Sequence, residues 1–500
     1  MKLNLQIQNK TWFLYLLPFF FVLHGLNENF GLIDLDNAGL LFAIYLGFSL
    51  TLASCLFLFL RNWKLSALIV FFCMAFFFFY GAIHDWVKTH APIPFFGKYI
   101  FVFPFTILVW VILFVVFSRP TVRLQRFTFF VNLLLLIYIL FDGISIIVKS
   151  LSPGTDKLSV YDFARNSHFK PCIDCEKPDI YFIILDEYAS SGSLHELYNY
   201  HNSFDSFLTK KGFHVLNKSR SNYNLTPFSV SSMLNMDYLT GIKDNNAIGV
   251  EDYINCNRLI KENKVIQFVS AQGYQIVNNS VFNLAGYPPV IDQKFLPVKT
   301  KLISAGTLFE RLHRDFEWWF KDKPVVSFFF PKYKFFNELE NNRKLVDLTV
   351  LESQKKSNNP RFVYTHLFFP HFPYFLDKNG IRKDPATVFK EFKMNSPTAY
   401  LDYLTGGNPA IEKMLDSIQI NTNGKAIIMV LGDHGFRNER IEDKKYFFQN
   451  MNAIYFPDGD YRLFPDSISL VNQFSLLFNK QFRQSFSIKK DSSIFLKEMK

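Results

Sequence analysis

Long apolar stretches alternate with short polar loops over the first 150 residues of the chain. Each runs for about 15 to 24 residues without a charge, close to the roughly 20 apolar residues that a helix needs to cross a bilayer. They cover residues 11–27, 37–60, 65–84, 99–118 and 127–148, the last interrupted by Asp142. The pattern predicts an α-helical membrane domain, with about five transmembrane helices, within residues 1–150.

Basic residues are unevenly shared among the loops that join these stretches. Lys2 and Lys10 precede the first stretch, Arg61 and Lys64 follow the second, and the loop SRPTVRLQR after the fourth holds three arginines. The loop after the first stretch carries only acidic residues, and the loop after the third is mixed. Because cytoplasmic loops are enriched in Lys and Arg, the N-terminus is expected inside the cell.

The first apolar stretch is followed by no small-residue cleavage site, so we expect it to be a retained anchor. Five spans starting inside place residues 151–500 outside the cytoplasm. The sequence thus predicts an integral protein of the inner or cytoplasmic membrane with an extracytoplasmic domain.

The net charge of +11 does not point to nucleic acid. The densest basic cluster lies in the short loops that face the inner leaflet, and no basic stripe is interleaved with aromatic residues. Cys172 and Cys175, in CIDC, can close a small disulfide loop in an oxidising compartment. A redox-active CxxC lacks a thioredoxin-like context, and a zinc site would need two further ligands at matching spacing.

The remainder of the chain has a different pattern. Residues 151–177 are polar, contain Pro and Gly, and are expected to be a linker. Residues 178–500 alternate short apolar runs with helical patterns, which predicts an α/β domain with a mostly parallel central sheet. The predicted strands are 179–185, 213–216, 274–280, 361–368 and 426–432, and the predicted helices include 193–211, 263–272 and 409–420.

Three of the predicted strands end in residues that can bind a metal. These residues are Asp186 and Glu187 after the first strand, His366 and His371 near the end of the fourth, and Asp433 and His434 after the fifth. In parallel sheets, ligands bind beyond the carboxyl ends of the strands, so one shared crevice is expected. Carboxylates with imidazole suit a divalent ion, with zinc or manganese favoured and magnesium or calcium also compatible. Taken alone, Asp433–Gly435 would also suit an ordinary turn.

A nucleophile is suggested by RSNYNLTPFSVSSMLNMDYL, residues 220–239. Thr226 precedes a predicted helix, and helix N-termini bind anions such as phosphate. A Thr hydroxyl attacks only when a base or a metal activates it. A cap of the helix by Thr226 or Ser229 is the simpler interpretation, and the residues alone leave both open.

The motifs LDEY, NYNLTPFSVSSMLNMDYL, THLFFPHFPY and LGDHGFR, taken together and in this order, resemble the alkaline phosphatase/sulfatase superfamily. They are most similar to its membrane-anchored, sulfatase-like branch, which contains lipoteichoic acid synthases and lipid A phosphoethanolamine transferases. That branch also has five N-terminal spans and an external catalytic domain. The resemblance implies a sulfatase-like catalytic domain over residues 178–500.

The resemblance also implies roles around one divalent ion and one transferred phosphoryl group. Asp186 would bind the metal, with Glu187 as a second or alternative ligand, and Asp433 and His434 would complete the metal site. Thr226 would be both the nucleophile and a metal ligand. His371 would hold phosphoryl oxygens or protonate the leaving group, with His366 in support, and Arg437 would contact the anion. No Arg follows Thr226–Pro227 at the sulfatase spacing, which argues against sulfate esters. The many disulfides typical of phosphoethanolamine transferases are also absent from the sequence.

The predicted function is therefore a membrane-bound phosphotransferase. It would move a phosphate-linked head group from a phospholipid donor to a lipid or glycan acceptor through a phospho-threonine intermediate. Two alternatives stay open at this level: a hydrolase of the same superfamily, a phosphodiesterase or phosphatase, and a non-catalytic membrane scaffold.

The charge pattern generates a test of topology. Protease added to intact spheroplasts should release a soluble fragment from residues 151–500, because these residues are expected outside the cytoplasm. Immunoblotting with antibodies against each half of the chain would detect the fragment. Complete protection of the C-terminal half would contradict the predicted orientation.

Overall fold

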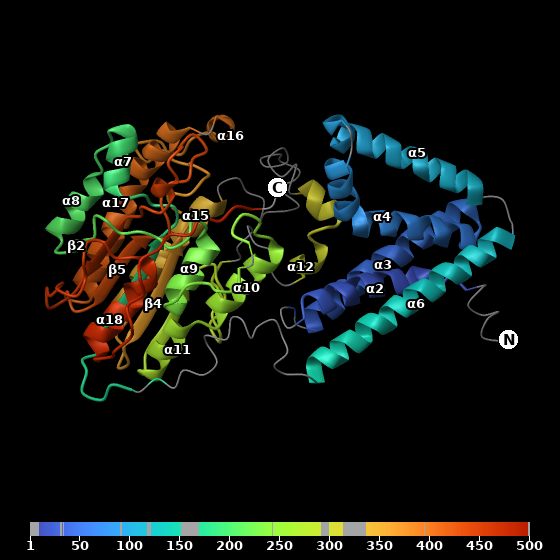
Figure 1. Ribbon diagram of the computed structural model, residues 1–500. Helices are drawn as coiled ribbons and strands as arrows, with labels where there is room; N and C mark the ends of the chain where they lie inside the picture. The colour runs from blue at the N-terminus through green and yellow to red at the C-terminus, as the bar shows by residue number, and fades with distance from the viewer. Residues whose placement is uncertain are drawn as a thin grey trace. The chain divides into compact units, whose positions relative to one another are not determined.

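The computed structural model of the protein describes residues 10–30, 33, 35–90, 93–117, 122–151, 169, 171–242, 244–291, 300–313, 337–394 and 396–498. The chain divides into two compact units (Figure 1). The first comprises residues 1–156 and 294–323, and the second residues 157–293 and 324–500.

The first unit is built of helices. They are α2 (Phe13–Glu28), α3 (Leu35–Leu60), α4 (Trp63–His90), α5 (Tyr99–Phe117), α6 (Val122–Leu151) and the short α12 (Lys301–Ser304). Many large apolar side chains point outward, among them Phe59, Ile100 and Leu140. Apolar surface on this scale is costly in water and favourable in lipid, which agrees with a membrane domain.

Three stretches in the described part of the chain are long and apolar enough to cross a membrane: Leu35–Leu60, Trp63–Lys88 and Gln125–Leu151. The apolar helices Phe13–Glu28 and Tyr99–Val109 are shorter. Each of the five apolar stretches contains a helix in its described part, but among the described residues length and composition support three spans. The count of five transmembrane helices stays a prediction.

Buried polar contacts join α2 to α6. Asp142 of α6 accepts a hydrogen bond of 2.7 Å from Asn27 Nδ2, and His24 Nδ1 lies 3.1 Å from its other oxygen. At the other end of the pair, Asn132 Oδ1 accepts from the amide of Phe13 at 2.7 Å. Because unpartnered polar groups are costly among apolar side chains, these contacts fix how the two helices pack.

Residues 294–323 cluster with the helical unit although they lie within the predicted catalytic domain, residues 178–500. Ile303, in the described part of this segment, is 7% exposed and belongs to the same apolar core as α2, α3 and α4. The second unit is therefore interrupted in sequence by a segment of the first. The predicted linker, 151–177, lies mostly outside the described residues, but Cys172 and Cys175 near its end are joined by a disulfide.

The second unit contains a six-stranded sheet among its described residues, in the order β2-β6-β5-β1-β4-β3. The strands are β1 (Ile180–Leu185), β2 (His214–Val215), β3 (Gln275–Asn279), β4 (Arg361–Leu367), β5 (Ile427–Gly432) and β6 (Asn452–Tyr455). β3, β4, β1 and β5 are parallel, whereas β6 pairs antiparallel with both β5 and β2. The predicted α/β architecture with a mostly parallel sheet is confirmed.

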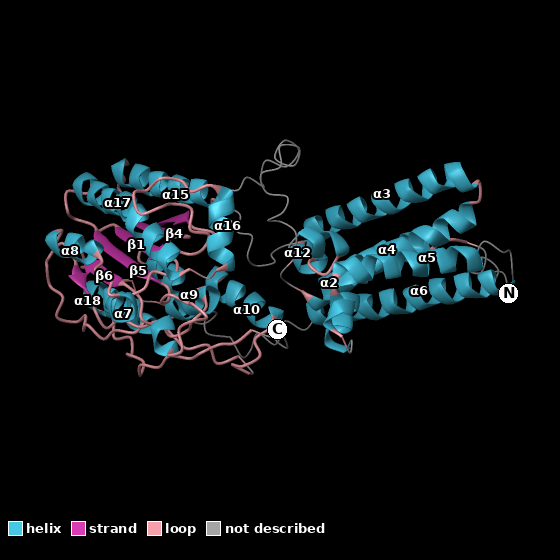
Figure 2. Ribbon diagram, turned by 90° about the horizontal axis from the view of Figure 1, so that it is seen from above, coloured by secondary structure: helices cyan, strands magenta, loops and turns pink. Residues whose placement is uncertain are grey.

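Helices cover both faces of the sheet. α15 (Asn337–Gln354) and α17 (Pro397–Asn421) lie on one side, and α9 (Thr226–Asn235) and α18 (Gln473–Phe482) on the other (Figure 2). Successive side chains of each strand point to opposite faces of the sheet. On one face Phe182 of β1 packs against Phe474 of α18, and on the other Thr365 of β4 forms a hydrogen bond of 2.7 Å with Thr349 of α15. The strands β1 and β5, buried on both faces, are apolar along their length, which is why they are recognisable as short apolar runs.

Further helices surround these layers. They are α7 (Ser191–Tyr198), α8 (Ser203–Lys210), α10 (Val250–Lys261), α11 (Lys264–Ala271) and α16 (Pro385–Lys393). The single helix predicted over 193–211 is wrong, because the chain breaks into α7 and α8. Asn199 caps α7 in the left-handed conformation, with φ at 48°, and Asn202 starts α8 by accepting from the amide of Phe204.

Candidate active site

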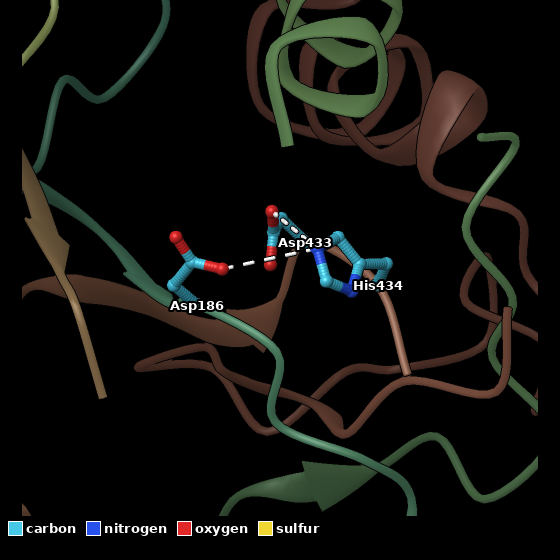
Figure 3. A group of neighbouring side chains, drawn as sticks. All are labelled: Asp186, Asp433 and His434. Atoms are coloured by element: carbon cyan, nitrogen blue, oxygen red, sulfur yellow. Dashed lines mark ion pairs between the residues drawn. The ribbon is translucent and has the colours of Figure 1, made fainter. Parts of the chain in front are cut away.

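The strand register brings the polar residues of β1 and β5 together. Leu185, the last residue of β1, pairs with Gly432 on one side and with Leu367 on the other. The residues that follow, Asp186 and Asp433, therefore leave adjacent strands at the same edge of the sheet (Figure 3). This is the carboxyl edge where ligands of parallel sheets bind.

Asp186, Asp433 and His434 form a compact group of possible metal ligands. One ligand atom from each lies within 4.8 Å of the others, and all three residues are buried. Figure 3 shows the imidazole of His434 turned towards the two carboxylates, with Nε2 at 3.8 Å from Asp186 Oδ1 and 3.5 Å from Asp433 Oδ2. In the described part of the chain, these three side chains are the ones grouped closely enough to bind a metal ion together.

His434 is prepared to act as a ligand by its local contacts. Its Nδ1 lies 2.8 Å from the carbonyl oxygen of Gly435, which can only accept a hydrogen bond. Nδ1 therefore carries the proton, and Nε2 keeps a lone pair that faces the carboxylates. Burial, helped by the charge of Arg437, lowers the pKa of His434 to about 4. The imidazole is thus neutral at physiological pH, as metal binding requires.

The pKa values of the two buried carboxyls are shifted in opposite directions. Burial, followed by the charge of Asp186, raises the pKa of Asp433 to about 6. Burial would also raise the pKa of Asp186, but the imidazoles of His371, His366 and His434 outweigh it and lower that pKa below its usual range. Once the pH is well above the raised pKa of Asp433, both carboxyls are ionised beside a neutral His434, so two negative charges are buried together.

Asp433 Oδ2 and His366 Nε2 are among the buried polar atoms near this group that have no hydrogen-bond partner in the described part of the chain. Buried polar atoms are normally paired, so unpaired ones indicate a missing partner. A divalent cation would supply that partner and offset the two carboxylates. Two oxygens and one imidazole nitrogen suit zinc or manganese. The residues present therefore fit a divalent metal ion.

Thr226 is the first residue of α9, and its hydroxyl lies beside the same group. Thr226 Oγ1 is 3.2 Å from Asp186 Oδ1 and 3.2 Å from His434 Nε2. In the described structure no side chain caps α9 at Leu225, and Ser229 Oγ donates to the carbonyl of Asp433 at 2.6 Å. Neither the Thr226 nor the Ser229 hydroxyl therefore caps the helix.

Glu187 turns away from the neighbouring Asp186. Its φ of 64° is left-handed, which is rare for a residue with a long side chain. Its carboxylate accepts a hydrogen bond of 2.9 Å from the amide of Arg437, and the guanidinium Nε lies at 3.5 Å. Of the two adjacent acids, Asp186 is the one in the metal-capable group, and Glu187 orients the cationic Arg437 instead.

The two predicted histidines occupy different positions. His371 has a side chain 31% exposed; its Nδ1 lies 2.6 Å from the carbonyl of Phe372, and its Nε2 is 3.9 Å from Glu187. His366 is fully buried on β4, with Nε2 at 3.7 Å from Asp186 Oδ2. His371 is therefore reachable by a substrate, whereas His366 can act only through Asp186 or a bound ion.

Two features of the site were not predicted. Tyr364 OH lies 3.0 Å from His366 Nδ1, and the alternation of side chains along β4 is a signal that could have revealed this contact. Asn224 pairs with the C-terminal segment: Leu496 donates its amide to Asn224 Oδ1 at 2.7 Å and accepts from Asn224 Nδ2 at 3.1 Å. Nothing local in the sequence indicates that the segment before Thr226 is held by the end of the chain.

No family model and no curated protein matches the chain. Among solved structures, the chain is similar to the periplasmic domain of EptC from Escherichia coli in complex with zinc, with 11% identity over 63% of this chain and 86% of that one, and a TM-score of 0.38. The periplasmic domain of the phosphoethanolamine transferase EptC from Campylobacter jejuni matches with 12% identity, coverage of 64% and 95%, and a TM-score of 0.36.

The phosphonate monoester hydrolase SpPMH from Silicibacter pomeroyi matches with 11% identity, coverage of 63% and 76%, and a TM-score of 0.40. A phosphoethanolamine transferase is among the kinds of protein that the motifs resemble. At such low identities and TM-scores the likenesses decide nothing about activity. The function is therefore inferred from the side chains of the site.

The geometry of His434 generates a prediction about metal content. His434→Ala should lose most of the bound divalent ion, because it removes the neutral nitrogen that completes the group. Metal can be measured by inductively coupled plasma mass spectrometry on the purified full-length protein. His195→Ala, an exposed histidine outside this group, is the matched control and should keep the metal of the wild type. Equal metal in both variants would place the metal site elsewhere.

Proposed function

We propose that the protein is a membrane-anchored, metal-dependent phosphotransferase. It moves a phosphate-linked head group from a phospholipid donor to a lipid or glycan acceptor, and Thr226 carries the head group between the two. In this proposal Asp186, Asp433 and His434 bind one divalent ion, zinc or manganese.

The observation that carries this proposal is the position of Thr226 Oγ1, 3.2 Å from both Asp186 Oδ1 and His434 Nε2. A hydroxyl between two metal-capable side chains, on the first residue of a ten-residue helix, is in the place a nucleophile would need. The helix N-terminus favours the negative charge of the phosphoryl group. A bound divalent ion lowers the pKa of a nearby hydroxyl and neutralises charge that develops on phosphate oxygens.

The remaining residues have roles that follow from their contacts. The Thr226 hydroxyl loses its proton to water, and its oxygen forms a bond to phosphorus while the bond from phosphorus to the donor's leaving oxygen breaks. His371 gives that oxygen a proton, since its imidazole is partly exposed and its Nε2 faces Glu187. Arg437, held by Glu187, contacts the phosphoryl oxygens. An acceptor hydroxyl then gives its proton to His371, which has lost its own, and its oxygen bonds to phosphorus. The bond between phosphorus and the Thr226 oxygen breaks, and Thr226 takes a proton back from water.

The helical unit supports a substrate in the membrane. Three stretches long enough to span a bilayer keep the catalytic unit at its surface, where a lipid donor and a lipid-linked acceptor share one plane. The distribution of basic loops puts the catalytic unit on the extracytoplasmic side, with about five spans in all. The membrane is then the inner or cytoplasmic membrane.

Hydrolysis is the alternative within the same chemistry, with water in place of the acceptor hydroxyl. The two outcomes differ in where label from the donor's phosphate is found: in a new lipid or glycan for transfer, and in a water-soluble product for hydrolysis. A non-catalytic scaffold is less compatible with a buried hydroxyl, two carboxylates and a neutral imidazole brought to one point.

Thr226→Ala should bind metal and be inactive, because the variant keeps the three ligands but lacks the nucleophile. Thr226→Ser should keep part of the activity, since its hydroxyl can occupy the same place. Intact-mass spectrometry of wild-type protein purified from membranes should reveal a phosphate-linked adduct on Thr226, whose mass identifies the head group. Ser229→Ala is the control for the neighbouring hydroxyl and should still carry the adduct. An active Thr226→Ala protein would disprove the proposed nucleophile.

His371→Ala should lower turnover by roughly 100- to 10,000-fold, the usual contribution of a general acid or base, while metal content stays unchanged. Turnover and metal are measured on the same preparation. A donor with an aryl leaving group, which needs little protonation, should be affected much less than a lipid donor. Loss of metal in this variant would instead make His371 a ligand.

A further inference from the structure

The segment 300–313 lies in the sequence between strands β3 and β4 of the catalytic unit, yet it packs within the helical unit. It contains α12 and the turn that follows, and its residues Ile303, Ser304 and Thr307 are all buried. The chain therefore passes from the helical unit to the catalytic unit twice: once after α6 and once after this segment.

Two glycines of the helices form the surface that receives this segment. A Cβ at Gly25 of α2 would lie 2.8 Å from Ile303 Cγ2, and a Cβ at Gly81 of α4 would lie 2.7 Å from the carbonyl oxygen of Gly306. The amide of Gly81 donates to that same oxygen at 2.7 Å. Any side chain at Gly81 would push the segment away, so close approach depends on glycine here.

An ion pair closes the contact next to Gly81. Arg311 reaches Asp85 of α4 with both terminal nitrogens: Nη1 lies 2.9 Å from Oδ1 and Nη2 2.5 Å from Oδ2. The Arg311 side chain is 16% exposed. A two-point guanidinium–carboxylate contact fixes orientation as well as distance. Gly81 and Asp85 are one helical turn apart, so the backbone bond and the ion pair act on one face of α4.

The position of the contact along the helices agrees with the predicted topology. Gly25 and Asp85 lie close to the ends of α2 and α4 that the charge pattern assigns to the outer side of the membrane. A segment that leaves the catalytic half of the chain can reach these ends without crossing the bilayer.

We propose that the segment 300–313 is a second anchor, which holds the catalytic unit at the membrane so that its site works on membrane-embedded substrate. The inference rests on the proposed function. A single linker would let the catalytic unit explore a large volume above the bilayer, whereas a second attachment limits it to a smaller one. The effective concentration of the site at the lipid surface rises accordingly. Gly81, Asp85 and Arg311 are then positioning residues, since they act without touching substrate.

The test compares two substrates on the full-length protein reconstituted in vesicles. One is the total lipid of the producing cells, radiolabelled in phosphate and built into the vesicles; the other is soluble bis(4-nitrophenyl) phosphate. Gly81→Ala and Arg311→Asp should lower turnover of the vesicle lipid by about tenfold or more and leave turnover of the soluble ester nearly unchanged. Trypsin should cleave at Lys301 faster in both variants than in the wild type.

Each variant has a matched control in the same chain. Gly47→Ala adds the same methyl group to α3, where no described atom lies within 4 Å of it, and should behave as the wild type on both substrates. Arg462→Asp reverses a charge that is 88% exposed in the catalytic unit and that pairs with the nearby Asp460. Adding Asp85→Arg to Arg311→Asp restores an ion pair of opposite sense and should recover lipid turnover.

The outcomes separate the anchor from the proposed function. Equal losses on both substrates, or no loss on either, would overturn the anchor while leaving the phosphotransferase intact. Wild-type protein that turns over neither substrate would overturn the proposed function. In that case the rate of tryptic cleavage at Lys301 still tests whether the segment 300–313 packs on the helices. An unchanged rate in Gly81→Ala and Arg311→Asp would overturn the proposed anchor.

Discussion

The register between β1 and β5 is the constraint on which the site depends. Leu185 stands opposite Gly432, so the chain delivers Asp186 and Asp433 side by side where the two strands end. A shift of one residue would turn every side chain of the moved strand to the other face. Gly432 is part of this constraint, because a Cβ there would lie 2.3 Å from the carbonyl oxygen of Tyr188. The close fit of backbone against backbone keeps the two acids together.

Placing two carboxylates in one buried position is costly unless positive charge or hydrogen-bond donors face them. The protein meets that need from several elements at once. The amide of Glu187 donates to Asp433 Oδ1 at 3.0 Å, the hydroxyl of Thr226 donates to Asp186 Oδ1, and His366 approaches Asp186 from β4. One carboxylate oxygen, Asp433 Oδ2, is left over among the described residues, and it faces the imidazole of His434. A divalent cation held by Asp186, Asp433 and His434 would balance the charge of the two carboxylates.

Much of the fold and of the site could be predicted because the relevant signals are local. The central strands are short apolar runs, and the rule for the carboxyl ends of parallel strands places Asp186 near Asp433 and His434. Strand β6, with four residues, was not predicted. That Asp186 rather than Glu187 lies beside Asp433 and His434 accompanies the left-handed φ of Glu187, which the sequence does not signal. The docking of the segment 300–313 joins residues more than 200 positions apart, for which the sequence has no local signal.

The order of strands in the sheet also determines when the protein can be completed during synthesis. β1 is made early, but both of its neighbours, β4 and β5, follow the segment 300–313 in the chain. The helices that receive this segment emerge first, so the helical unit can assemble while half of the sheet is still missing. Until β4 and β5 arrive, β1 is an apolar strand with two unpaired edges, a species prone to aggregation. The nascent chain therefore needs protection of residues 180–185 on the side of the membrane where the catalytic unit folds.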